Sequence, residues 1–310
     1  MQTNNTLRIH AYGGPAVAQI DQVPVPTPET GQVLVQVTAA GVNGLDWKIR
    51  DGLVRDVFQL ALPATLGIEL AGVVVGTGPG ATRFAAGDRV MGSLGGLGAY
   101  ATFVTVDEAK LCRIPASLTD VTAAALPVAS LTAWQALRAA GELRPGQRIL
   151  IHGAAGGVGG FAVQFAKAAG ATVYATASGA SRTHVLGLGA DEVIDRHAER
   201  FEDRLQQIDL VLDLVGGETL DRSWSVLAPG GAIVSTAAPD IGQRAPAGHR
   251  GLWFMMRPDA AQLRQIADAV AAGTLRSTLA ETVGLAGLSA AIERNKQGHA
   301  PGKIVFDLSL

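Results

Sequence analysis

The sequence is poor in cysteine and in charge, and each shortage removes a class of protein. Cys112 is the only cysteine among 310 residues, so the chain can form neither an intrachain disulfide nor a zinc site built from several cysteines. Charged residues make up 17% of the chain and the net charge is −2, without the basic cluster that nucleic-acid binding requires. Residues 1–6 are polar and unlike a signal peptide, so we expect a cytoplasmic protein without membrane segments.

Glycine, in contrast, is abundant, and one glycine-rich turn dominates the pattern. Residues 148–152 form a short apolar run typical of a buried parallel strand, and the turn GAAGGVG at 153–159 follows at once. A helix with apolar residues at helical spacing and a second strand at 172–177 complete the unit. This order predicts a dinucleotide-binding turn rather than a turn made for packing alone, with Ala154 where the first glycine usually stands. We expect cofactor contacts from four residues of the turn: Ala155, Gly156, Gly157 and Val158.

The end of the second strand predicts which nicotinamide cofactor is bound. NAD sites place an acidic residue there to accept hydrogen bonds from the ribose, and residues 176–180 contain none. Ser178 and Arg182 can instead donate to a 2′-phosphate, and Arg196 follows the next strand. The alternative is that both arginines are ordinary surface charges. The missing acid favours NADP(H).

The remaining pattern indicates an α/β protein of two domains. Many short strands with glycine turns precede any long helix, which suggests a small closed or partly closed β-domain. A doubly wound parallel sheet follows, with further strands expected at 192–194, 210–214, 231–235 and 252–256. Strands at 279–283 and 304–306 then return to the first domain. We expect domain segments 1–121 and 258–310 around a nucleotide-binding domain at 122–257.

Several motifs together resemble the medium-chain dehydrogenase/reductase superfamily, and within it the zinc-independent quinone oxidoreductase branch. They are GVN…DWKIR at 41–50, GIE…GVV at 67–74, F…GDRV at 84–90, LP…LTAW at 126–134, AAGGVG at 154–159, GADEVID at 189–195, VGGE at 215–218 and GH…GKIV at 298–305. The resemblance implies a GroES-like barrel, a Rossmann domain and an active site in the cleft between them. Zinc-dependent members carry a cysteine and a histidine where this chain has Asn43 and Ile68, so the resemblance implies no metal.

The resemblance also implies the site residues. Asn43 and Lys48 are the nearest candidate donors to a substrate oxygen, although related reductases have a tyrosine where Lys48 stands. Thr132 matches a position that touches the nicotinamide. Four further residues are expected at the carboxamide end of the cofactor: Val215, Gly216, Ser235 and Thr236. The alternatives are that Asn43 satisfies a turn and that Lys48 is solvated. Asp46 and Glu69 look structural, with Glu69 expected to pair with a cation.

Without a Lewis acid, the chemistry expected is hydride transfer from NADPH to an acceptor that is already electron-poor, a quinone or an α,β-unsaturated carbonyl. The alternatives are a dedicated enone or enal reductase and a non-catalytic NADPH-binding regulatory protein. The apolar run at 251–256 would form a sheet edge, and pairing with a second copy predicts a homodimer.

Overall fold

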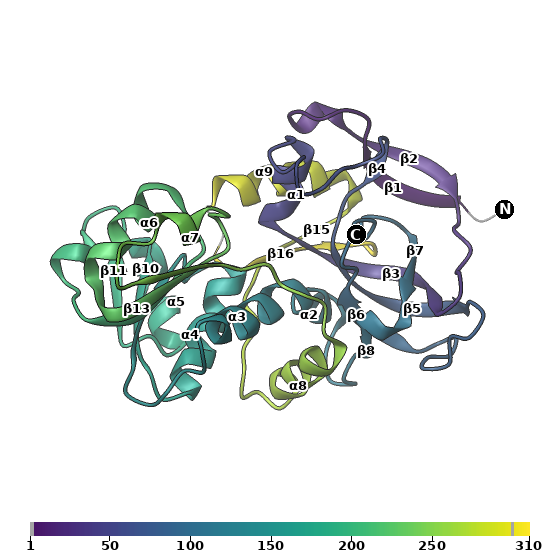
Figure 1. The fold of residues 1–310 in the computed structure, drawn as a ribbon. Helices are drawn as coiled ribbons and strands as arrows, with labels where there is room; N and C mark the ends of the chain where they lie inside the picture. The colour runs from purple at the N-terminus through teal and green to yellow at the C-terminus, as the bar shows by residue number, and fades with distance from the viewer. Residues whose placement is uncertain (1–2, 299–300) are drawn as a thin grey trace. The chain divides into compact units, whose positions relative to one another are not determined.

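The protein is described here by a computed structural model covering residues 3–298 and 301–310; residues 1–2 and His299 of the last motif lie outside the described residues. The chain divides into two compact units, residues 1–128 with 258–310, and residues 129–257 (Figure 1). The sequence placed the first boundary at 121/122, where helix begins. In the structure helix α2 (Asp120–Ala124) packs on strands β3 and β5 of the first unit, which moves that boundary to 128/129.

The second unit contains a parallel sheet with the order β11-β10-β9-β12-β13-β14. The strands are β9 (Arg148–His152), β10 (Thr172–Ala177), β11 (Glu192–Asp195), β12 (Ile208–Asp213), β13 (Leu227–Ser235) and β14 (Arg250–Trp253). The helices are α3 (Pro127–Ala139, which starts in the first unit), α4 (Gly157–Ala168), α5 (Arg182–Gly187), α6 (Gly217–Ser223) and α7 (Ile241–Arg244). Strand order reverses between β9 and β12, so the predicted doubly wound sheet is confirmed, with its switch point at these two strands.

The core of this sheet follows from its uninterrupted apolar strands. Leu150, Val211 and Ile233 are fully buried on three neighbouring strands, as expected for a sheet covered on its faces by helices. The last strand is shifted from its predicted position at 252–256. It ends at Trp253, and Phe254 adds one more bond by donating its N–H to the carbonyl of Ser235 at 2.9 Å.

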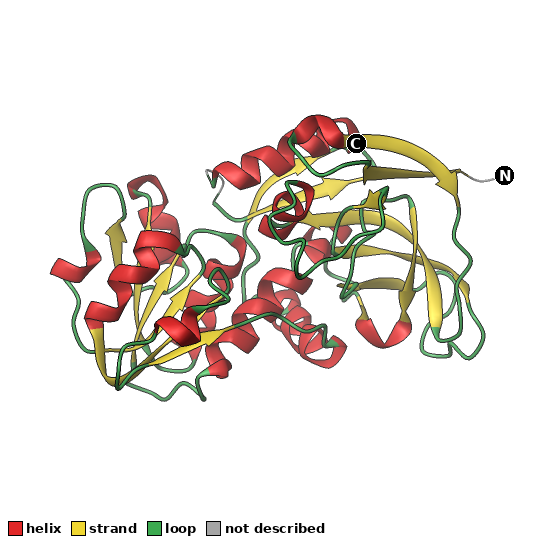
Figure 2. Ribbon diagram, turned by 45° about the horizontal axis from the view of Figure 1, so that its top comes forward, coloured by secondary structure: helices red, strands yellow, loops and turns green. Residues whose placement is uncertain are grey.

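The first unit is mostly antiparallel β-structure (Figure 2). One sheet has the order β2-β1-β4 and the other β15-β16-β3-β5-β6-β8, with β7 also paired to β3. The strands are β1 (Thr3–Ile9), β2 (Ala18–Pro24), β3 (Gln32–Val42), β4 (Ala64–Thr65), β5 (Glu69–Thr77), β6 (Arg89–Ser93), β7 (Phe103–Asp107), β8 (Leu111–Arg113), β15 (Leu279–Val283) and β16 (Lys303–Asp307). The helices besides α2 are α1 (Gly44–Arg50), α8 (Ala260–Ala271) and α9 (Leu288–Gln297).

One pairing in this unit joins the two ends of the sequence. Strand β16 runs antiparallel to β3 with Ile304 opposite Val42, which places Lys303 beside Asn43. Residues 258–310 therefore complete the sheet that residues 3–128 begin, as the sequence pattern predicted. Across the described ranges, 3–298 and 301–310, every helix is too short or too polar to span a bilayer.

Candidate functional site

The glycine-rich turn between β9 and α4 has the geometry of a phosphate-binding turn. Gly153 adopts a φ of +72°, and helix α4 begins with Gly156 as its N-terminal flanking residue. A Cβ atom on Gly159 would lie 2.3 Å from the carbonyl oxygen of Gly153 and 2.6 Å from Cα of Ala154, so the helix packs directly on the turn. A Cβ on Gly156 would instead meet only the Gly153 oxygen, at 3.4 Å. The first N–H groups of a helix have no acceptor within it, so we expect those at the start of α4, with Ala155, Gly157 and Val158, to bind a pyrophosphate.

The four residues expected near the carboxamide end of the cofactor are held together by the carboxylate of Asp213, which the sequence did not lead us to predict. Asp213 is fully buried at the end of β12, and its Oδ1 accepts from the N–H groups of Val215 at 3.1 Å and Gly216 at 2.9 Å. Its Oδ2 accepts from the Ser235 hydroxyl at 2.6 Å, and the N–H of Thr236 donates to the Asp213 carbonyl at 3.1 Å. One buried acid therefore fixes the loops after β12 and β13. An Asp at the end of an apolar run was the available signal.

The residues predicted for the 2′-phosphate also gather, at the ends of β10 and β11. The hydroxyls of Ser178 and Ser181 lie 3.1 Å apart, and Arg196 donates its backbone N–H to Ala177 at 2.9 Å. Arg182 is 45% exposed and pairs with Glu199, with Nη2 to Oε1 at 2.9 Å. Residues 176–180 contain no acidic residue, but the fold brings carboxylates of β11 and of the loop after it next to them.

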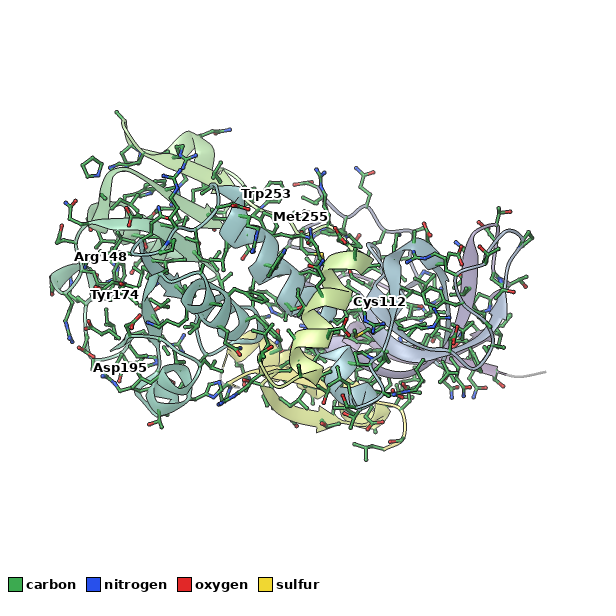
Figure 3. All side chains as sticks on the ribbon, turned by 90° about the horizontal axis from the view of Figure 1, so that it is seen from below. Cys112, Arg148, Tyr174, Asp195, Trp253 and Met255 are labelled. Atoms are coloured by element: carbon green, nitrogen blue, oxygen red, sulfur yellow. The ribbon has the colours of Figure 1, made fainter. Side chains whose placement is uncertain are left out.

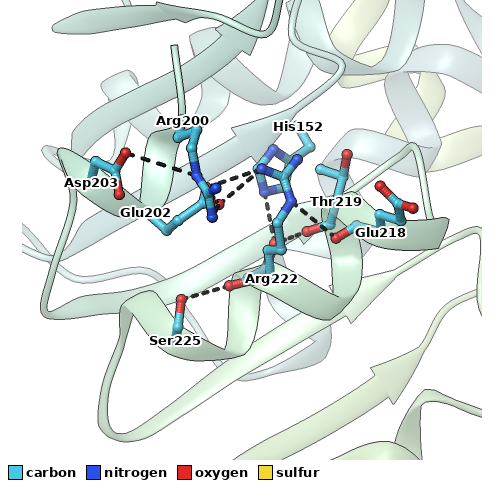
Figure 4. A network of polar contacts seen from close by, with 9 residues as sticks. His152, Arg200, Glu202, Asp203, Glu218, Thr219, Arg222 and Ser225 are labelled. Atoms are coloured by element: carbon cyan, nitrogen blue, oxygen red, sulfur yellow. Dashed lines mark hydrogen bonds and ion pairs between the residues drawn. The ribbon is translucent and has the colours of Figure 1, made fainter.

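A buried histidine directly before the turn links three elements of the second unit. His152 ends β9 and is fully buried, with Nδ1 2.9 Å from Thr176 Oγ1 and Nε2 2.9 Å from Ser223 Oγ. Ser223 donates its single proton to the carbonyl of Thr219 at 2.7 Å, so His152 must donate from Nε2 and accept at Nδ1. Burial lowers the pKa of His152 to about 4, beside the Arg222–Glu202 pair (Figure 4). The neutral ring is a structural link between β9, β10 and α6.

This link gives the protein a pH-dependent stability that His152→Gln should remove. The folded pKa of about 4 lies below the usual 6.5, so unfolding takes up a proton between these values and stability falls as pH falls from 6.5 to 4. The full change is about 3 kcal/mol at roughly 1.36 kcal/mol per pKa unit. In chemical denaturation, His152→Gln should be less stable than wild type at pH 6.5, and this difference in unfolding free energy should shrink as pH falls to 4. A difference that stays constant with pH would contradict the lowered pKa of His152.

The buried carboxyl of Asp46 should change stability with pH in the opposite direction, which makes it a control. Burial raises the pKa of Asp46 from 3.8 to about 6, so the folded protein holds a proton that the unfolded chain releases, and stability rises as pH falls through this range. Asp46→Asn removes that gain. Its stability relative to wild type should therefore be highest above pH 6 and decline as pH falls towards 3.8.

In the first unit, Asn43 belongs to a closed polar cluster. Its side-chain amide donates to Glu69 Oε1 at 2.8 Å and to the Gly41 carbonyl at 3.1 Å. The ammonium of Lys303 contacts Asn43 Oδ1, the Val42 carbonyl at 2.9 Å and Glu69 Oε1 at 2.6 Å. Glu69 is fully buried and pairs with a cation, as predicted. Both amide hydrogens of Asn43 and all three donors of Lys303 thus have partners within the protein.

Asp46 ties the same cluster to helix α1. Its Oδ2 accepts from the backbone N–H of Asn43 at 2.7 Å and from the Tyr100 hydroxyl at 2.6 Å. The first of these bonds is the returning half of a capping box, which explains why a helix starts here although the sequence analysis assigned none. Asp46 Oδ1 is buried and finds no hydrogen-bond partner among the described residues. Tyr100 and Lys303 were not predicted, since each reaches Asn43 or Asp46 from a distant part of the sequence.

Of the other two candidate catalytic residues, Lys48 is outside this cluster and Thr132 belongs to the other unit. Lys48 is on α1, with its ammonium 5.6 Å from the centre of the Trp47 ring. Thr132 is on α3 in the second unit and is 9% exposed. The structure therefore groups Asn43 with Lys303, Glu69 and Asp46, and not with Lys48.

The cluster does not suit a zinc ion. Asn43 and Ile68 supply no thiolate or imidazole, and an ammonium already contacts the Asn43 and Glu69 oxygens. Within residues 3–298 and 301–310, no group of three His, Cys, Asp or Glu side chains is arranged to hold a metal. Cys112 is buried, and burial raises the pKa of its thiol to about 12 (Figure 3).

Comparison with known proteins identifies the family. Residues 29–116 match the alcohol dehydrogenase GroES-like domain, and residues 188–306 match a domain described as zinc-binding dehydrogenase. A 2-haloacrylate reductase from Burkholderia sp is 34% identical over 308 residues, covering 91% of this chain and 92% of that protein. The chain belongs to the medium-chain dehydrogenase/reductase superfamily.

Solved structures of the medium-chain dehydrogenase/reductase superfamily confirm both domain types. The quinone oxidoreductase of Coxiella burnetii is 32% identical with a TM-score of 0.94, over 99% of this chain and 100% of that one. The Escherichia coli quinone oxidoreductase, solved with NADPH, is 28% identical with a TM-score of 0.89, over 98% and 99%. The predicted fold class, a Rossmann domain with a GroES-like domain, is confirmed.

Other relatives in this superfamily are far larger proteins. Polyketide synthases match with up to 38% identity, and the chain spans only 5–15% of their length. The structure of the CurK enoyl reductase is also similar, with 25% identity and a TM-score of 0.88.

Proposed function

We propose that this protein is an NADPH-dependent, zinc-independent oxidoreductase that transfers hydride to a quinone or an α,β-unsaturated carbonyl compound. The observation that carries this proposal is the β9–α4 turn, where Gly159 packs against Gly153 at the start of a helix, at the point where the strand order reverses. The quinone oxidoreductase relatives and the NADPH complex of one of them support it.

Each part of the second unit has a role in this proposal. The turn at Ala155–Val158 would bind the pyrophosphate, Ser178 and Arg182 the 2′-phosphate, and the loops fixed by Asp213 the nicotinamide end. When bound, NADPH supplies the hydride. The cluster around Lys303 keeps Asn43 in one orientation, and Asn43 would exchange its bond to the Gly41 carbonyl for a bond to substrate.

The choice between acceptors is the finer part of the proposal. The 2-haloacrylate reductase and CurK relatives favour a carbon–carbon double bond conjugated to a carbonyl as the second candidate acceptor. Consumption of NADPH should be followed by absorbance with a panel of quinones, enals, enones and acrylates. Turnover of either group supports a reductase, whereas inactivity on every acceptor together with tight NADPH binding would favour the non-catalytic alternative.

Cofactor preference gives a direct check of the phosphate site. Arg182→Ala removes a charge-assisted bond to the 2′-phosphate, and we expect KM for NADPH to rise about tenfold while KM for NADH stays unchanged. The exposure of Arg182, 45%, keeps the effect below that of a buried contact. Steady-state kinetics with both cofactors measure it, and an equal loss for NADH would remove Arg182 from the phosphate site.

We also propose that the protein is a homodimer. Strand β14 is an edge of the sheet. Trp253 at its end and Met255 just after it are 42% and 47% exposed (Figure 3). Pairing of two β14 strands would cover both side chains. Light scattering at micromolar concentration should report a dimer, and Trp253→Glu should shift it towards monomer. A monomeric wild type would contradict this proposal.

A further inference from the structure

The predicted 2′-phosphate site is already occupied by a network of internal ion pairs. Glu199 lies at its centre, since Oε1 accepts from Arg182 Nη2 at 2.9 Å and from the backbone N–H of Asp195 at 3.1 Å. Its Oε2 contacts Arg204 Nη1, and Arg204 Nη2 pairs with Glu192 at 2.6 Å. Three donors therefore hold the Glu199 carboxylate in place, and they keep its pKa below the ordinary value.

We propose that Glu199 is a specificity-determining residue. It competes with the 2′-phosphate of NADPH for Arg182 and so reduces the preference of the protein for NADPH over NADH. This inference rests on the proposed cofactor site. A phosphate that binds Arg182 brings about two negative charges next to a carboxylate that stays ionised. The guanidinium must then share its donors between two anions or release Glu199, and NADH meets no such cost.

A second carboxylate acts in the same direction. A Cβ atom on Gly179 would lie 2.4 Å from Asp195 Oδ2, so this acid lies against the loop that carries Ser178. Register pairs Asp195 with Ala177, the last residue of β10. A carboxylate near this strand end is also the group that accepts a ribose 2′-hydroxyl in NAD sites. The neighbouring strand thus supplies the acid that residues 176–180 lack.

The test compares binding of 2′,5′-ADP, which carries the phosphate, with 5′-AMP, which does not. In isothermal titration calorimetry, Glu199→Gln should bind 2′,5′-ADP about threefold to fivefold more tightly than wild type, with 5′-AMP unchanged. Glu192→Gln is the matched control, because it also removes one negative charge, from the carboxylate that pairs with Arg204, and leaves the Arg182–Glu199 pair in place. This variant should bind both nucleotides like wild type.

A double-variant cycle shows whether Glu199 acts through Arg182. In an Arg182→Gln background, Glu199→Gln should no longer change the affinity for 2′,5′-ADP. Weaker binding of 2′,5′-ADP by Glu199→Gln would overturn the proposal, because Glu199 would then orient Arg182 for the phosphate. An equal change for 5′-AMP would overturn it as well.

The design separates this inference from the proposed function. Failure of the wild type to bind either nucleotide would overturn the cofactor site itself, whatever Glu199 does. Binding of both with no response to Glu199→Gln would overturn only the present proposal. Circular dichroism verifies folding of each variant, and Glu199→Ala replaces the glutamine variant if that one does not fold.

Discussion

Lys303→Met is expected to lower the free energy of unfolding by about 3–5 kcal/mol, the cost of leaving a buried charge unpaired. Lys303 is 6% exposed and its ammonium lies 2.6 Å from the carboxylate of Glu69, which is fully buried. Methionine keeps an unbranched side chain that is one atom shorter, and it removes the charge and its donors. Among the residues that the structure describes, Glu69 would then retain only the neutral N–H donors of Asn43 and Val128.

The matched control is Lys296→Met, which removes the same charge from an exposed pair. Lys296 is 40% exposed and lies 2.7 Å from Asp51, so its loss should cost about 1 kcal/mol or less. Urea denaturation followed by circular dichroism measures both variants. A Lys303→Met protein within about 1 kcal/mol of wild type would show that the buried pair contributes little.

Gly159→Ala should abolish most cofactor binding, because the turn and helix α4 leave no space for a side chain. The added Cβ would lie 2.3 Å and 2.6 Å from backbone atoms of Gly153 and Ala154, which cannot move as a flexible side chain would. Relief of this clash must shift the turn that presents N–H groups to the pyrophosphate. We expect affinity for NADPH to fall by at least about tenfold and stability by about 1–3 kcal/mol.

Gly187→Ala controls for the loss of a glycine from a helix of the same unit. Gly187 ends α5, and a Cβ there would meet nothing within 4 Å, so the change should leave NADPH affinity unaltered and slightly raise the melting temperature. Fluorescence titration with NADPH and thermal unfolding compare the two. Wild-type affinity in Gly159→Ala would mean that the turn does not hold the pyrophosphate.

Helices and strands that depend on a local residue pattern were predicted from the sequence. Those that depend on contacts with distant residues were not. The strand at 148–152 was placed correctly because an unbroken apolar run between polar residues leaves few other structures. Helix α1 was missed because Gly44 and Trp47 are weak helix formers, and the bond between Tyr100 and Asp46 that anchors it spans 54 residues.

The candidate site shows the same division. The positions of the turn at 153–159 and of Ser178, Arg182 and Arg196 follow from their places after parallel strands. The partners of those residues do not: Glu199 meets Arg182 only through the loop after β11, and Lys303 reaches Asn43 across 260 positions. Asp213 was within reach of sequence reasoning, since an acid at the end of an apolar run calls for a partner.

The return of the chain to its first sheet has a consequence for biosynthesis. During synthesis from the N-terminus, residues 129–257 are complete as a unit before β16 has left the ribosome, so the unit that starts second is the first that can finish folding. Until then the edge of β3 at residues 39–42 has no β16 partner and Glu69 has no lysine. We therefore expect the nascent N-terminal segment to be more prone to aggregation than the completed chain.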